Sequence, residues 1–238
     1  MIRKYIPDFI TSLNLLCGVV GIVLVFKGRF DWAFYAMLAG AVFDFCDGLA
    51  ARALDAYSPM GKELDSLADV VTFGALPSLM LLNLMKACSF TESIWCWIPL
   101  VIAVFSGLRL AKFNVDERQH SSFIGLPTPA CAMICGSLCS FVAFQPDCFL
   151  CAWVAGPVFV PVLSVVLSAL LVCELPMFSM KFSSKDAPVL KRKRLFFAIN
   201  CVICVAVVAI TGQNWTLAVL LSFVVYIVMN AAFAIFKI

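Results

Sequence analysis

The chain has 238 residues, of which 63% are hydrophobic and 13% are charged, and its mean hydropathy is +1.04. This composition excludes a water-soluble globular protein, because several apolar runs exceed the length of about 18 residues that spans a hydrocarbon core. The net charge of +3 is small and gives no sign of a nucleic-acid partner.

The apolar runs predict an all-α, polytopic transmembrane helical bundle, because backbone polar groups in a bilayer must be satisfied within helices. We expect about eight spans, at residues 9–27, 31–50, 62–86, 94–112, 126–144, 148–174, 195–211 and 215–236. The start Met1–Lys4 is basic, but no small-residue cleavage site follows it, so we expect no cleaved signal peptide.

Basic residues gather in alternate loops of this eight-span arrangement. One set of loops and termini holds Arg3, Lys4, Arg52, Lys62, Lys112, Arg118, His120, Lys181, Lys185, Lys191, Arg192, Lys193, Arg194 and Lys237. The opposite loops hold Lys27, Arg29, Lys86, Asp147 and few other charges. Because cytoplasmic loops are enriched in Lys and Arg, we expect a multi-pass protein of the cell (inner) membrane with both termini in the cytoplasm.

The first span opens with Pro7-Asp8-x2-Thr11-x2-Asn14. A proline at a helix start with an Asp or Thr cap explains this stretch structurally. The 12 cysteines are scattered through apolar runs, and none forms a Cys-x-x-Cys pair beside the histidine. Buried free cysteine behaves as a small hydrophobic side chain, so we expect neither a disulfide framework nor a zinc site.

Four carboxylates stand between the second and third predicted spans. Asp44 and Asp47 are i,i+3 neighbours on one helix, and Asp65 and Asp69 are i,i+4 neighbours on the next, so each pair shares a face. Carboxylates this close repel one another unless a positive charge lies between them. A hard divalent cation, Mg²⁺ or Mn²⁺, suits such oxygen ligands. The alternative, four loop carboxylates at a membrane surface, explains neither the spacing nor the small residues between them.

The full pattern is Asp44-x2-Asp47-Gly48-x2-Ala51-Arg52-x8-Gly61-x3-Asp65-x3-Asp69, and it resembles the signature of the CDP-alcohol phosphatidyltransferases at every fixed position. The resemblance implies a CDP-diacylglycerol donor, two metal ions held by the four aspartates, Asp69 as general base, and a homodimer in the lipid bilayer. It also implies nucleotide or diphosphate contacts, which we assign to Gly48, Ala51, Arg52, Ser58, Gly61, Pro7, Asp8, Thr11 and Asn14.

A second pair of motifs, Arg109-x2-Lys112-Phe113-Asn114 and Phe123-x-Gly125-Leu126-Pro127-x-Pro129-Ala130, is similar to the phosphatidylserine synthase branch of this family. A cation in an apolar span needs a partner, and the carboxylate of L-serine needs a cation. We therefore assign Arg109 and Lys112 to the acceptor. Glycerol 3-phosphate and an inositol phosphate remain alternative acceptors. A divalent-cation transporter is a distant alternative, and it lacks support because no inverted repeat is evident.

The resemblance also suggests a division of the chain into three regions. We expect a catalytic membrane core at 1–174, a basic cytoplasmic loop at 175–194, and two accessory transmembrane helices at 195–238. The basic loop is explained by the topology of the chain, and binding of anionic lipid headgroups is an alternative role for it.

Overall fold

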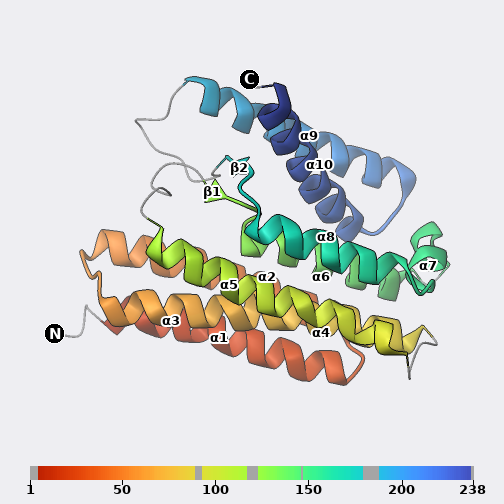
Figure 1. The fold of residues 1–238 in the computed structure, drawn as a ribbon, viewed down its shortest axis with the longest axis horizontal. Coiled ribbons are helices and arrows are strands. Elements are labelled where there is room, and N and C mark those ends of the chain that lie inside the picture. Colours follow the sequence, from red (N-terminus) through yellow and green to blue (C-terminus); the bar gives the residue numbers. More distant parts are fainter. Residues whose placement is uncertain (1–4, 89–92, 117–122, 146, 179–187, 237–238) are drawn as a thin grey trace.

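In a computed structural model the chain folds into a helical bundle, described here for residues 5–88, 93–116, 123–145, 147–178 and 188–236 (Figure 1). Its elements are α1 (Tyr5–Phe26), α2 (Phe30–Ala53), α3 (Pro59–Asp69), the π-helical turn η2 (Val70–Ala75), α4 (Leu76–Ala87), the 3₁₀ segment η3 (Ile94–Leu100), α5 (Val101–Val115), β1 (Phe123–Ile124), α6 (Thr128–Phe144), α7 (Phe149–Val154), α8 (Phe159–Val172), β2 (Pro176–Met177), α9 (Pro188–Thr211) and α10 (Trp215–Phe236).

The predicted all-α membrane fold is confirmed. Within the described residues, six helical segments are long and apolar enough to cross a membrane, and two shorter apolar helices, α6 and α8, complete the set of eight predicted spans. The sixth span was wrong in detail, because a break between α7 and α8 interrupts it. Gly156 and Pro157 lie in this break, and proline disfavours helical geometry in the residue before it.

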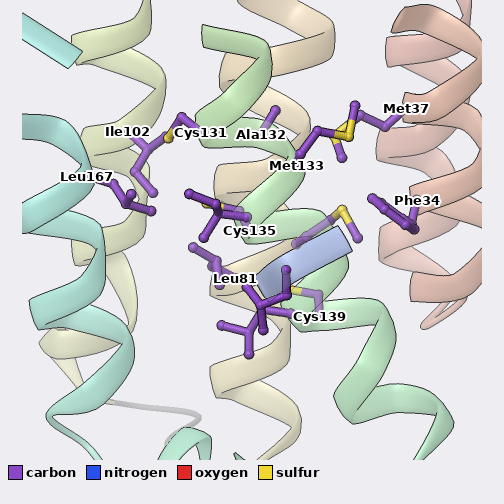
Figure 2. Packing of buried hydrophobic residues seen from close by; sticks show 14 of the residues in the cluster. Phe34, Met37, Leu81, Ile102, Cys131, Ala132, Met133, Cys135, Cys139 and Leu167 are labelled. Carbon is purple, nitrogen blue, oxygen red and sulfur yellow. The ribbon is translucent and has the colours of Figure 1, made fainter. Parts of the chain in front are cut away.

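Helix α6 forms the centre of the bundle. Nearly every one of its residues is buried, including Cys131, Cys135 and Cys139, which follow one another at helical spacing. Figure 2 shows these thiols between the side chains of α2, α4, α5 and α8, where they pack as small hydrophobic groups. Gly136 lets α2 approach, since a Cβ at that position would lie 2.8 Å from a ring carbon of Phe34. This core determines where α2 and α5 place their polar residues.

The segment from Pro59 to Ala87 is the most enclosed of the six long spans, with 67% of its most apolar window buried. It runs through α3, the turn η2 and α4 without leaving helical geometry. In η2, Thr72 donates its hydroxyl to the carbonyl of Asn14 on α1 at 3.0 Å. A Cβ on Gly40 of α2 would lie 2.7 Å from Cγ2 of Thr72, so the small glycine lets these helices meet. The π-helical turn η2 thus begins directly after Asp69 and packs against α1 and α2.

Two short features differ from the prediction. The strands β1 and β2 form an antiparallel pair, which the apolar pattern did not indicate because each strand is only two residues long. Helix α9 begins at Pro188, so Lys191–Arg194 are helical and not part of a loop. Proline is favoured in the first helical turn, and Lys and Arg are good helix formers. The predicted basic loop also includes residues 179–187, which lie outside the described residues.

Candidate active site

Helices α2 and α3 bring three of the predicted metal ligands together. One carboxylate oxygen from each of Asp44, Asp47 and Asp65 lies within 4.8 Å of the other two. Asp47 is buried, and the other two are half-buried. Three negative groups this close are stable only with positive charge between them, and carboxylate oxygens are the ligands that hard divalent cations prefer. The donor set therefore fits a hard divalent cation.

Asp69, the fourth predicted ligand, lies outside this set of mutually close oxygens. Its side chain is 8% exposed, and its Oδ1 accepts a hydrogen bond of 3.4 Å from Nδ2 of Asn14. It interacts electrostatically with Asp44 and Asp65, and also with Arg109 on α5. Asp69 thus interacts with both the carboxylate cluster and a buried cation.

Two residues of α1 donate hydrogen bonds to the carboxylates. Thr11 is buried, and its hydroxyl donates to Oδ2 of Asp47 at 2.6 Å. Asn14 is buried and donates to Asp69 in the same way. Both residues were predicted to contact the nucleotide. The structure places them first as partners that orient two of the aspartates, and such partners tune the ligands of a metal site.

A pocket of about 210 Å³, partly open to solvent, lies beside the cluster. Its lining gathers most of the predicted nucleotide residues with two of the metal ligands: Pro7, Asp8, Thr11, Asp47, Gly48, Ala51, Ala56, Tyr57, Ser58, Gly61, Lys62 and Asp65. Arg52 is exposed and is not part of this lining.

The small residues of the pocket have different tasks. A Cβ on Gly48 would meet no heavy atom within 4 Å, so this position leaves open space on the pocket wall. Gly61 is the third residue of α3. A side chain there would come within 2.7 Å of Oδ1 of Asp8. Ser58 caps α3, since its Oγ accepts from the Gly61 amide at 2.8 Å, and it lines the pocket as well.

Three pocket residues were missed by sequence reasoning: Ala56, Tyr57 and Lys62. Lys62 directly follows Gly61, and the sequence assigned it only to the cytoplasmic charge count. Its Nζ donates to the carbonyl of Asn114 at 3.1 Å, and Nδ2 of Asn114 donates to Oγ of Ser66 at 2.8 Å. The position of Lys62 next to Gly61 of the aspartate motif was the signal in the sequence that could have indicated its place in the pocket. These bonds attach the end of α5 to α3 beside the pocket.

The two cations assigned to the acceptor have different surroundings. Arg109 is 7% exposed, its Nη1 donates to Oγ1 of Thr128 at 2.7 Å, and its guanidinium lies 5.5 Å from the ring centre of Phe113. Lys112 is half-buried, with 41% of its side chain exposed, and its Nζ lies 4.0 Å from a carboxylate oxygen of Glu174, which is exposed. Exposed ion pairs of this kind contribute little. Of the two cations, Arg109 is the one that interacts electrostatically with Asp69.

Fold and site together define a polytopic membrane protein with a carboxylate cluster that could hold a metal ion, beside an open pocket lined by α1, α2 and α3. The profile of the CDP-alcohol phosphatidyltransferase family matches residues 4–170. The chain belongs to this family, which confirms the resemblance of its aspartate motif and excludes the transporter alternative.

Curated relatives carry the name CDP-diacylglycerol–serine O-phosphatidyltransferase. The protein of Bacillus subtilis (strain 168) is 39% identical over 130 residues, which cover 55% of this chain and 72% of the relative. That of Methanocaldococcus jannaschii is 33% identical over 143 residues, 59% of this chain and 64% of the relative. That of Mycobacterium tuberculosis (strain H37Rv) is 35% identical over 190 residues, which cover 74% of this chain and 62% of the relative. The chain thus spans about three fifths to three quarters of the length of these relatives.

Proposed function

We propose that the chain transfers the phosphatidyl group of CDP-diacylglycerol to the hydroxyl of L-serine, giving phosphatidylserine and CMP. The observation that carries the serine assignment is the buried Arg109, which interacts electrostatically with Asp69. A cation next to a carboxylate base suits an acceptor that bears both a carboxylate and a hydroxyl. The names of the relatives support the same acceptor.

In this proposal the pocket binds the cytidine diphosphate part of the donor. Gly48 leaves room beside the α2 backbone, and Ala51, Ser58 and Gly61 line the same pocket. Lys62 adds a cation for the diphosphate, and Arg52, exposed at the end of α2, adds a second from outside the lining. Two Mg²⁺ or Mn²⁺ ions held by Asp44, Asp47, Asp65 and Asp69 would neutralise charge on the diphosphate.

Asp69 performs the proton transfer. Its carboxylate accepts the proton of the serine hydroxyl while Arg109 holds the serine carboxylate. The serine oxygen then forms a bond to the phosphorus that carries diacylglycerol, and the bond from that phosphorus to the bridging oxygen of CMP breaks. The electron pair leaves with CMP. Phosphoryl-type transfer needs chiefly positioning and charge neutralisation, and this arrangement supplies both.

The acceptor is tested by supplying purified protein with CDP-diacylglycerol, a divalent metal and one alcohol at a time, and measuring released CMP. We expect release with L-serine, and little with glycerol 3-phosphate or an inositol phosphate. A phosphorylated acceptor carries more negative charge, and among the described residues Arg109 is the buried cation beside Asp69. CMP release with a phosphorylated alcohol and not with serine would overturn the serine assignment and leave the family reaction intact.

The topology gives a second test. We propose that the pocket and both termini face the cytoplasm of the cell membrane, and that the protein acts there as a homodimer. A reporter that is active only outside the cytoplasm should be active when fused after Asp147 and inactive when fused after Asp186, because the basic residues near Asp186 retain their segment inside. A matched fusion after Lys62 should also be inactive. Equal activity after Asp147 and Asp186 would contradict the arrangement of eight spans.

A further inference from the structure

Two buried polar residues of α10 bind a single residue, Phe178. Tyr226 is fully buried, and its hydroxyl donates to the carbonyl of Phe178 at 2.9 Å. Asn230 is 2% exposed, and its Oδ1 accepts from the amide of Phe178 at 2.9 Å. Nδ2 of Asn230 donates to the carbonyl of Tyr226 at 2.7 Å, so the amide is oriented with its oxygen toward Phe178. Both main-chain groups of Phe178 are therefore held by the C-terminal helix.

The residues before Phe178 are hydrogen-bonded to the segment that leads into α6. Strand β2 pairs with β1, Met177 opposite Phe123 and Pro176 opposite Ile124. Directly after β1, the amide of Gly125 donates to the carbonyl of Leu175 at 2.9 Å. Gly125 has a φ of +79°, and a Cβ there would lie 2.6 Å from the carbonyl oxygen of Leu171. The turn that leads into α6 is thus fixed by backbone bonds and close packing.

Helix α6 begins at Thr128, three residues beyond this turn. Thr128 is fully buried, and its hydroxyl oxygen accepts the hydrogen bond from Arg109. Arg109 interacts electrostatically with both Tyr226 and Asp69. The guanidinium is therefore linked electrostatically to both the C-terminal helix and the carboxylate site. In Figure 1, α10 lies beside the β1–β2 pair.

We propose that Tyr226 and Asn230 are positioning residues for the acceptor site. They fix the Phe178 backbone, and through β2, β1 and Thr128 they hold the guanidinium of Arg109 where it meets the acceptor carboxylate. The proposal rests on the function proposed above, and it gives the predicted accessory helices a part in acceptor binding. Polar side chains in an apolar span are costly, and these two are directed at one backbone residue and not at a general packing surface.

The variant Tyr226→Phe tests this, because it removes one hydroxyl and keeps the ring that packs on Phe178 and Phe197. We expect the KM for serine to rise about fivefold or more, with the KM for CDP-diacylglycerol within about twofold of the wild type. Asn230→Ala should act in the same direction. Tyr35→Phe is the matched control, since Tyr35 stacks on Trp215 at the other end of α10 and should change neither constant.

A double variant separates positioning from general damage. In an Arg109→Ala background, Tyr226→Phe should raise the KM for serine by less than about twofold, because the group that it positions is gone. Full additivity, an unchanged serine KM in Tyr226→Phe, or equal rises for both substrates would each overturn the proposal. If wild-type protein releases no CMP with serine, the proposed function fails separately. The same ratios measured with the alcohol that does release CMP then decide whether α10 positions the acceptor site.

Discussion

Replacing Asp65 by Asn should lower the rate of CMP release by about a thousandfold or more. Asp65 is one of the three aspartates whose oxygens lie within 4.8 Å of one another, and it is the member supplied by α3. The amide keeps the size of the side chain and removes the charge that a divalent cation requires. Initial rates at saturating CDP-diacylglycerol and serine, measured over a series of metal concentrations, give the loss.

Asp55→Asn is the matched control for this variant. Asp55 is exposed in the connection between α2 and α3, and it has a φ of +48°, a conformation that asparagine adopts as readily as aspartate. Its activity should equal that of the wild type. Chelation of wild-type protein with EDTA should abolish activity, and added Mg²⁺ or Mn²⁺ should restore it. Substantial activity of Asp65→Asn at ordinary metal concentrations would contradict the metal-binding role of the cluster.

Replacing Arg109 by Ala should raise the KM for serine at least about tenfold and change the KM for CDP-diacylglycerol much less. A charge-assisted hydrogen bond to the serine carboxylate contributes roughly 1.5–3 kcal/mol, and each 1.4 kcal/mol is about a factor of ten. The donor pocket is lined by α1, α2, α3 and the connection between α2 and α3, so loss of a side chain on α5 leaves its lining intact.

The control for Arg109 is Arg29→Ala. Arg29 is more than half exposed, beside Asp31 at the start of α2, outside the pocket lining. Steady-state kinetics with each substrate varied in turn should show no change for this variant. An unchanged serine KM in Arg109→Ala would refute the assignment of Arg109 to the acceptor. Similar increases for both substrates would indicate that Arg109 acts through the structure of the bundle.

Local patterns explain why much of the fold could be predicted. The apolar runs are longer than a bilayer core, and a chain in a bilayer has few alternatives to helices, so all eight predicted spans contain a helix. The places where helices break or begin were harder to predict from the sequence. The break at Gly156 and Pro157 and the helical start at Pro188 each depend on one or two residues within an otherwise apolar or basic run. The strands β1 and β2 depend on pairing between segments about 50 residues apart.

For the site, the sequence by itself determined which carboxylates belong together, because i,i+3 and i,i+4 spacing places side chains on one helix face wherever the helix lies. It also determined the family, through eight residues at set intervals. Only the tertiary structure decided that Asp69 is outside the set of three mutually close carboxylates and interacts with Arg109 as well, and that Thr11 and Asn14 orient carboxylates. The bonds from Arg109 to Thr128 and from Phe178 to α10 are likewise tertiary. Such contacts join helices whose relative rotation is set by core packing around α6, and no periodicity along a single segment records that rotation.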